Sequence, residues 1–245
     1  MDRTFTPTDG VKLHYTVSGE GEIPVVFLPG MGQGADSFAS VSEKLGAEYR
    51  FYALDYRCHG ASEDVEYGYH IERFAADFKE MLQGAGVERF HLIAHSMGNT
   101  VAWAFFELYG QQNVISYVLE EEAPCLVADP AWSEEEEKSY CGNVLWPTFP
   151  GMPRDTVRNT FMDHLFHDHV NRDWRQELKR IQLPTLILMG TTSHYSCPPL
   201  WDWLTRNIQG SRFQALEGGH NLHVDNEAGF LAEVKPFLKQ HCDKR

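Results

Sequence analysis

One serine, placed between small residues where an apolar run meets a helix-like run, constrains this chain most. Ser96 lies in residues 94–98, AHSMG, directly after the apolar residues 90–93. This pattern is typical of a nucleophile elbow, a strand-to-helix turn so tight that the serine takes a strained backbone conformation. Bulky side chains at Ala94 or Gly98 would collide with neighbouring chain. The pattern therefore predicts an exposed hydroxyl beside helix N-terminal amides, which favour developing negative charge.

Composition limits the partners of the chain. Its 245 residues are enough for one core with an insertion, and its formal net charge of −14 disfavours nucleic acid and anionic membranes. Five scattered cysteines with no CxxC spacing disfavour a disulfide framework or a zinc site. The N-terminus lacks a signal-peptide pattern, and no apolar run is long enough to cross a bilayer. We expect a cytoplasmic protein that acts on a small-molecule substrate and binds neither nucleic acid nor membranes. The sequence does not predict its oligomeric state.

The order of elements predicts an α/β fold. Strands are expected at residues 4–7, 11–18, 23–28, 49–54, 90–95, 114–120, 185–189 and 212–216. Helices are expected at residues 36–45, 71–82, 97–109, 200–208 and 226–239, the second of them ended by Gly84. Strands that alternate with helices predict a mostly parallel sheet with helices on both faces.

Residues 124–181 break this alternation, because they hold many aromatic residues, several prolines and no strand-like run. We interpret them as an insertion of short helices into a core formed by residues 1–123 and 182–245. Its glutamate run, residues 134–137, is expected to be a solvated helix face. The histidine-rich residues 164–169 are expected to form a polar helix and no metal site, since no ligand frame at zinc spacing completes them.

Aromatic residues of the insertion are candidates for a substrate pocket. Two alternatives stay open for them: they line an apolar pocket, or they pack the insertion onto the core. The candidates for the pocket lining are Trp146, Phe149, Phe161 and Phe166.

A serine nucleophile needs a base and an oxyanion hole. His220 follows two glycines in the loop after the last expected strand, and its position after Ser96 fits the chain order serine, acid, histidine. The amide of Met97, directly after the serine, is the first candidate oxyanion donor. Met31, in the glycine-rich loop after residues 23–28, is the second, because glycines at a strand end allow close approach of backbone to a ligand. His95 is expected to pack beneath the turn, since strand neighbours point to opposite faces.

Two further motifs resemble those of a known protein family. Residues 55–62, DYRCHGAS, resemble the D-x-R-G-H-G-x-S loop of the α/β-hydrolase fold superfamily, with Cys58 at a usual glycine. Residues 218–223 resemble the segment around that family's catalytic histidine, and residues 124–181 lie where the family places its cap, after the sixth strand. The resemblance implies the α/β-hydrolase fold with a helical cap and a serine esterase mechanism. No metal or organic cofactor is expected.

The position of the catalytic acid, the residue that orients the histidine, departs from the family pattern. The family usually carries an aspartate shortly after the seventh strand, in a G-x-x-D pattern, but residues 190–193 read GTTS and end in Ser193. Some members of the fold, such as many haloalkane dehalogenases, carry the acid after the sixth strand instead. Here residues 120–122 are three glutamates, and Glu121 falls on the acid position if residues 114–119 are aligned with that sixth strand. Glu120 stays the alternative, because a one-residue shift reverses side-chain direction in a strand.

The sequence thus predicts a carboxylesterase-like serine hydrolase that cleaves a small or medium apolar ester through an acyl-enzyme. Ser96 attacks, His220 transfers the proton, Glu121 orients the histidine, and Met31 and Met97 hold the oxyanion. Two alternatives remain open: a carbon–carbon bond hydrolase acting on a diketone-type substrate, and a non-catalytic ligand-binding or receptor member. The absent aspartate after the seventh strand is the feature that favours the non-catalytic alternative.

Overall fold

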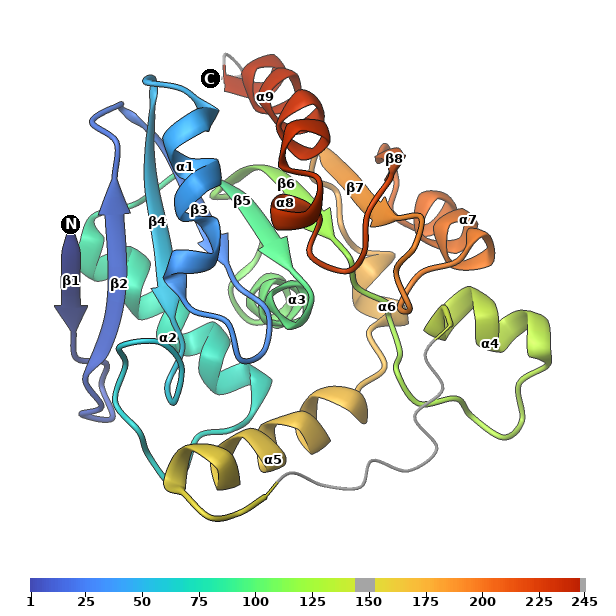
Figure 1. Cartoon of the computed structure of the whole chain (residues 1–245), viewed down its shortest axis with the longest axis horizontal. Coiled ribbons are helices and arrows are strands. Elements are labelled where there is room, and N and C mark those ends of the chain that lie inside the picture. Colours follow the sequence, from blue (N-terminus) through green and yellow to red (C-terminus); the bar gives the residue numbers. More distant parts are fainter. Residues whose placement is uncertain (144–152, 243–245) are drawn as a thin grey trace.

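The computed structural model describes residues 1–143 and 153–242 and contains one eight-stranded sheet of order β1-β2-β4-β3-β5-β6-β7-β8 (Figure 1). The first three strands of that order pair antiparallel, and all later pairs are parallel. The mostly parallel sheet expected from the sequence is therefore confirmed. The strands are β1 (Asp2–Phe5), β2 (Leu13–Ser18), β3 (Ile23–Leu28), β4 (Tyr49–Asp55), β5 (Phe90–His95), β6 (Val114–Glu120), β7 (Thr185–Gly190) and β8 (Arg212–Leu216).

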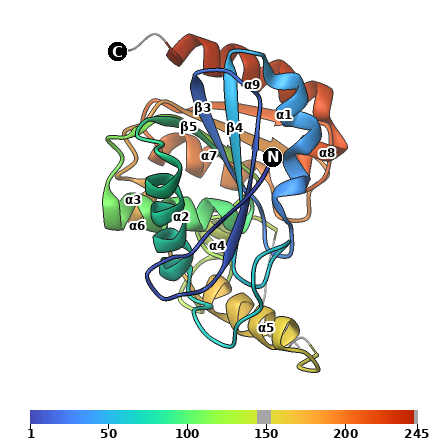
Figure 2. The same ribbon diagram turned by 90° about the vertical axis from the view of Figure 1, so that its left-hand side faces the viewer.

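Helices cover both faces of the sheet. Figure 2 shows α1 and α8 on one side of the strands and α2 and α3 on the other. Alternate residues of a strand feed the two cores: in β3, Val25 and Phe27 pack on the α1 side, whereas Val26 and Leu28 pack on the α2 side. The described helices are η1 (Ala35–Phe38), α1 (Ala39–Leu45), α2 (Ile71–Ala85), α3 (Met97–Tyr109), α4 (Glu134–Cys141), α5 (Val157–Val170), α6 (Arg175–Leu178), α7 (Pro198–Asn207), α8 (Leu222–Asp225) and α9 (Glu227–Cys242).

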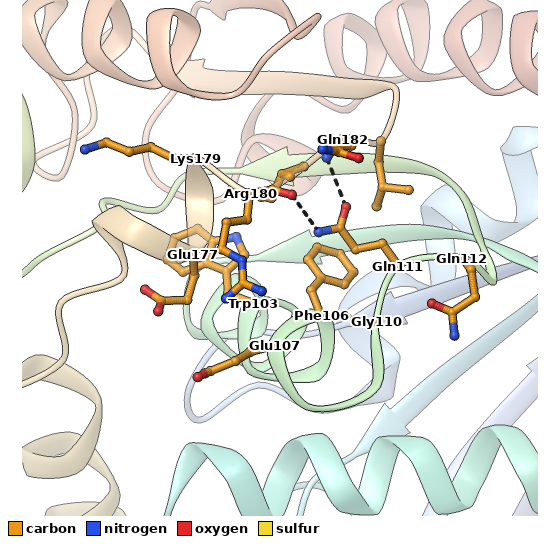
Figure 3. Close-up of a pocket in the computed structure, with 12 residues that line it drawn as sticks. Trp103, Phe106, Glu107, Gly110, Gln111, Gln112, Glu177, Lys179, Arg180 and Gln182 are labelled. Carbon is orange, nitrogen blue, oxygen red and sulfur yellow. Dashed lines mark hydrogen bonds between the residues drawn. The ribbon is translucent and has the colours of Figure 1, made fainter.

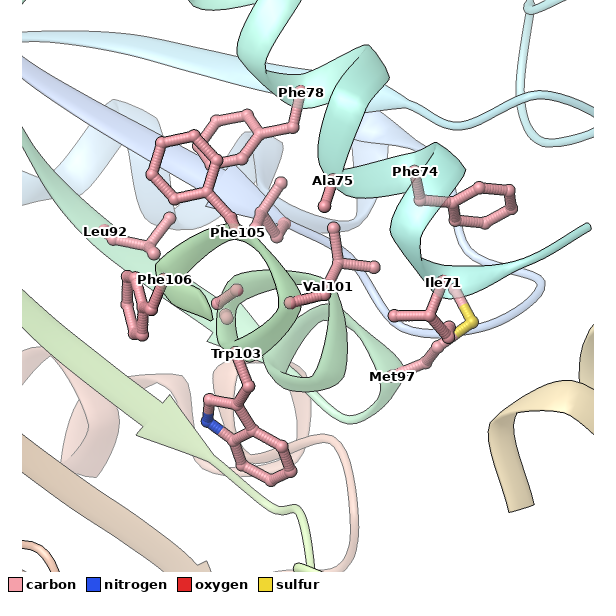
Figure 4. Close-up of a cluster of buried hydrophobic side chains, with 14 of the residues drawn as sticks. Ile71, Phe74, Ala75, Phe78, Leu92, Met97, Val101, Trp103, Phe105 and Phe106 are labelled. Atoms are coloured by element: carbon pink, nitrogen blue, oxygen red, sulfur yellow. The ribbon is translucent and has the colours of Figure 1, made fainter. Parts of the chain in front are cut away.

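Helix α3, which starts directly after Ser96, is buried on nearly all sides. Its aromatic residues pack among those of α2, for example Phe105 against Phe78 with ring centroids 4.8 Å apart (Figure 4). Trp103 Nε1 donates a hydrogen bond of 3.1 Å to the hydroxyl of Tyr117 on β6. A helix held from both sides gives the serine a rigid base.

Several helix ends differ from the expected bounds, and two of these differences have a clear physical reason. Helix α2 continues past Gly84 and ends before Gly86, whose φ of +69° is the left-handed conformation of a helix C-cap. An added Cβ at Gly84 would meet nothing within 4 Å, so this glycine interrupts no packing. Helix α7 begins at Pro198 instead of Leu200, because proline suits the first turn of a helix.

The stretch between β6 and β7 contains α4, α5 and α6 among its described residues, and its β-structure there is limited to one isolated bridge between Cys125 and Asp173. Glu134, Glu135 and Glu136 of α4 are exposed, as expected, and Glu137 is half-buried. Helix α5 is tied to the core, because Asp168 accepts a 3.0 Å hydrogen bond from the amide of Ile71, at the start of α2. Asp168 also bonds Arg172, which supports a structural role for this polar helix. No helix in the described part of the chain has the length and apolar character that membrane crossing requires.

Candidate active site

Ser96 occupies the turn between β5 and α3 with φ +50° and ψ −130°. A positive φ is costly for a residue with a side chain and persists only where the surrounding structure imposes it. A Cβ at Gly98 would lie 2.2 Å from the carbonyl oxygen of Leu28, so only glycine fits two residues after the serine. The strained, closely packed turn is the one that the sequence predicts.

The two candidate oxyanion donors lie on segments that touch. The same Cβ at Gly98 would lie 2.8 Å from the carbonyl oxygen of Pro29, so the start of α3 packs directly on the loop after β3. Neither the Met31 amide nor the Met97 amide donates a hydrogen bond to a described residue. Their role in an oxyanion hole stays a prediction.

His220 and Glu121 come together although 99 positions separate them. His220 Nδ1 lies 3.2 Å from Glu121 Oε2, and its Nε2 has no hydrogen-bond partner among the described residues. The His220 side chain is 24% exposed and that of Glu121 0%. The carbonyl oxygen of His220 lies 2.8 Å from Nε2 of His95, the residue before the serine, so the histidine loop adjoins the turn. No hydrogen bond joins Ser96 to His220 within the described structure, as is common for catalytic pairs without substrate.

Both carboxylate oxygens of Glu121 accept hydrogen bonds. The amide of Gly190 donates to Oε1, and the hydroxyl of Ser193 donates to Oε2 at 2.5 Å. Glu121 has φ +53°, a left-handed conformation just past the end of β6. Ser193 stands at the position of the family's usual aspartate, and here it is a hydrogen-bond donor to the neighbouring strand's carboxylate.

Glu120 pairs with a different histidine. Its Oε1 accepts from the amide of His223 at 2.8 Å and lies 2.9 Å from His223 Nδ1, and both side chains are 0% exposed. Burial by itself would raise the pKa of Glu120, but the charges of His223 and His95 and the hydrogen bonds from His223 outweigh burial and lower it. The alternative acid of the sequence analysis thus pairs with His223, and no hydrogen bond joins it to His220 among the described residues.

Ligand atoms of His95, Glu120 and His223 all lie within 4.8 Å of one another, a spacing that could hold a metal ion. Most of these atoms are already engaged, and only His223 Nε2 is buried without a hydrogen-bond partner among the described residues of the cluster. His95 Nε2 contacts the carbonyl oxygen of His220, its Nδ1 contacts Gln33, and His223 Nδ1 contacts Glu120. A metal would have to displace these contacts, so the cluster is better explained as a hydrogen-bond network.

Gln33 is the residue of this network that the sequence analysis missed. Its Oε1 accepts from the amide of Gly30 at 2.9 Å and lies 2.9 Å from His95 Nδ1. Its Nε2 donates to Asn221, next to His220, at 2.9 Å. One side chain thus links the loop of Met31, the strand before Ser96 and the histidine loop. Only its place in a glycine-rich loop signals this role in the sequence.

The predicted pocket aromatics are only partly described. Phe161 is 1% exposed and packs against Phe74 with ring centroids 6.1 Å apart, and Phe166 is 9% exposed within the same core. Trp146 and Phe149 lie outside the described residues. Packing on the core is therefore shown for Phe161 and Phe166, and a pocket lining stays a prediction for all four.

A cavity of about 680 Å³ lies away from the candidate catalytic residues, between the end of α3 and residues 177–183 (Figure 3). Trp103 and Phe106 contribute its apolar side, and Gln111 bonds the carbonyl oxygen of Arg180 across it at 3.0 Å. Neither Ser96 nor His220 lines this cavity. Its size therefore says nothing about the candidate active site.

Comparison with known proteins identifies the family. Residues 23–169 match the family model described as alpha/beta hydrolase fold. Serine hydrolase BPHL of Mus musculus is 28% identical over 247 residues, which cover 94% of this chain and 84% of that protein. The 3-oxoadipate enol-lactonase 1 of Acinetobacter baylyi is 20% identical, over 96% of both proteins.

An esterase from Exiguobacterium antarcticum has the same fold, with a TM-score of 0.81, 22% identity and coverage of 98% of this chain and 100% of that one. The expectation of a hydrolase that acts on esters agrees with the names of these proteins. The match of the family model over more than half of the sequence establishes that the chain belongs to the alpha/beta hydrolase fold family.

Proposed function

We propose that the protein is a serine hydrolase that cleaves a carboxylic ester through Ser96, His220 and Glu121. The observation that carries the proposal is the 3.2 Å contact between His220 Nδ1 and the buried carboxylate of Glu121. A serine nucleophile needs a histidine that an acid holds in one tautomer, and this contact supplies that acid despite Ser193 at its usual position. The names of the relatives, serine hydrolase, esterase and enol-lactonase, support the same class.

The first half of the reaction forms an acyl-enzyme. Ser96 Oγ attacks the ester carbonyl carbon while His220 Nε2 takes the hydroxyl proton. The carbonyl oxygen becomes negative and accepts hydrogen bonds from the Met31 and Met97 amides. The intermediate then collapses, the carbon–oxygen bond to the alcohol breaks, and His220 returns its proton to the leaving alkoxide.

The second half repeats these steps with water. His220 takes a proton from the water, whose oxygen attacks the acyl carbon, and Ser96 leaves with the proton that His220 returns. Glu121 stays ionised throughout, since it accepts from Gly190, Ser193 and His220 and stabilises the imidazolium form.

The catalytic acid can follow either β6 or β7, because these are neighbouring parallel strands whose carboxyl ends meet at one edge of the sheet. Ser193, at the end of β7, hydrogen-bonds Glu121, at the end of β6. We therefore expect a carboxylate at either position to reach His220. In this proposal residues 124–181 form a helical cap, and a small or medium ester with largely apolar character binds beneath it, beside Phe161 and Phe166.

A fluorophosphonate probe tests the class, since it labels activated serines covalently. We expect labelling of the wild-type protein and none of Ser96→Ala. An unlabelled wild type, or equal labelling of Ser96→Ala, would contradict the proposal and favour a non-catalytic ligand-binding member. Rates on an alkyl ester series beside a diketone panel then separate ester hydrolysis from carbon–carbon bond hydrolysis, and faster turnover of diketones would overturn the ester proposal.

A further inference from the structure

Beside the candidate catalytic residues lies a polar pair that the proposed mechanism does not use. Glu122, just past β6, is 4% exposed, and His169, on α5, is 7% exposed. Glu122 Oε2 lies 3.6 Å from His169 Nε2. This distance is too long for a hydrogen bond between the two atoms, and neither atom hydrogen-bonds another described residue.

The pair lies close to the reacting groups. Thr100 stands one helical turn after Ser96 on α3, and its hydroxyl lies 3.4 Å from His169 Nδ1. Tyr195 contacts the His220 ring, with centroids 4.2 Å apart. Burial, followed by the charges of Glu122 and Glu121, raises the pKa of Tyr195.

The hydrogen bonds assign the protons of the pair. Thr100 donates to the carbonyl oxygen of Met97 at 2.8 Å, so its oxygen accepts from His169 Nδ1–H and leaves His169 Nε2 as an acceptor. Glu122 Oε1 accepts from the amide of Ala123 at 2.8 Å, which leaves Oε2 to carry an acid proton.

The electrostatics agree with this assignment. Burial raises the pKa of Glu122 to about 8, and the charge of Glu121 adds to the rise although the Ala123 amide opposes it. Burial lowers the pKa of His169 to about 4. Near neutral pH the pair is therefore mostly uncharged, with one O–H donor and one ring-nitrogen acceptor facing each other across 3.6 Å.

We propose that Glu122 and His169 bind a neutral hydroxyl group of the substrate, so that the preferred ester carries a hydroxyl on its acyl or alcohol part. A hydroxyl accepts one hydrogen bond and donates one, which matches this pair. A carboxylate would meet the charge of Glu121, and an ammonium offers three donors, no acceptor and a large desolvation cost. The inference rests on the proposed ester hydrolysis and narrows its substrate class.

The test compares kcat/KM for two matched ester pairs at pH 7. The first pair is p-nitrophenyl butyrate and p-nitrophenyl 3-hydroxybutyrate, and the second is butyl butyrate and 4-hydroxybutyl butyrate. We expect the hydroxyl-bearing ester to be favoured at least about tenfold in one pair, because buried polar groups discriminate against an analogue that leaves them unpaired. Glu122→Met and His169→Phe should each bring that ratio close to one.

His167→Phe is the matched control, since His167 is on the same helix but half exposed and beside Asp163. It should keep the wild-type ratio. The hydroxyl inference is overturned if the wild type favours the plain esters, if a succinate half-ester or a 4-aminobutyrate ester is preferred, or if both variants keep the wild-type ratio. Fluorophosphonate labelling of Ser96 in every sample separates the two failures: an unlabelled wild type overturns the proposed function and this inference with it, whereas a labelled enzyme without hydroxyl preference overturns only the inference.

Discussion

Glu120 and Glu121 are neighbours with the same chemistry, both fully buried and each bonded to a histidine, yet their surroundings differ. The Glu121 partner, His220, is 24% exposed and keeps Nε2 available. The Glu120 partner, His223, is 0% exposed and its ring stacks on Phe38 with centroids 4.3 Å apart. A carboxylate–histidine pair can serve catalysis only where the histidine reaches a substrate, so we assign catalysis to the first pair and stability to the second.

Backbone geometry separates the two carboxylates. Glu120 is the last residue of β6, and its carbonyl oxygen accepts from the amide of Ser96 at 3.0 Å. Glu121 leaves the strand with φ +53°, and its amide still bonds Leu188 of β7 at 3.0 Å. The chain thus changes from extended to left-handed backbone between the two residues, and their side chains contact different histidines.

The largest expected effect is on kcat, and it distinguishes the Glu121–His220 pair from the Glu120–His223 pair. Glu121→Gln should lower kcat on p-nitrophenyl butyrate about 10⁴-fold, by analogy with the loss of a triad acid, because the amide no longer holds the reactive tautomer of His220. Glu120→Gln is the matched control and should stay within about tenfold of wild type when assayed where it is folded. Equal losses of kcat in two folded variants would break the assignment.

The effects on stability should have the opposite order, with Glu120→Gln destabilising the fold more than Glu121→Gln. Glu120→Gln removes the buried carboxylate charge that faces His223 and should lower the free energy of unfolding by about 3 kcal/mol at pH 7, measured by urea denaturation. The pKa of Glu120 is lowered in the folded state from its ordinary value of 4.5, so its stabilisation is present above pH 4.5 and is lost as the pH falls through the folded value. The gap between wild type and variant should therefore close in acid. A gap that does not depend on pH would contradict the assigned charge of Glu120.

A smaller effect is expected at Ser193. Ser193→Ala removes one hydrogen bond to the ionised Glu121, worth about 1.5–3 kcal/mol, and should lower kcat about 10- to 100-fold with KM little changed. Ser196→Ala is a suitable control, since Ser196 is also buried but bonds Trp201 instead of the acid. An unchanged kcat in Ser193→Ala would show that the Glu121 carboxylate is positioned without it.

Most elements of the fold follow from the sequence. The bounds of β3, β5, α3, β6 and β8 are those expected, because apolar runs bounded by turn residues mark them clearly. The short α8 was not predicted, since a single turn of four residues has no periodicity to detect. Helix α2 passes through Gly84 because its partners on the core side outweigh the low helix propensity of one exposed glycine.

The site was predictable where chain order and strand ends carry the signal. Ser96, His220 and the proximity of Glu121 to His220 follow from these patterns and from the family resemblance. The Glu120–His223 pair and the Gln33 network do not, since they join residues 103 and 188 positions apart whose separation only the packed structure determines. The left-handed backbone at Glu121 is likewise invisible in the sequence, because glutamate has no preference for it.

The most direct test of Glu121 as the catalytic acid is to remove its carboxylate and place one at position 193 instead. The kcat/KM of Glu121→Gln should be compared with that of the double variant Glu121→Gln with Ser193→Asp, on p-nitrophenyl butyrate. Because Ser193 Oγ lies 2.5 Å from Glu121 Oε2, an aspartate at position 193 reaches the same region beside His220. We predict a large loss in the single variant and a recovery of at least about tenfold in the double variant. A single variant with near wild-type kcat/KM, or a folded double variant with no recovery, would contradict the assignment of Glu121 as the catalytic acid.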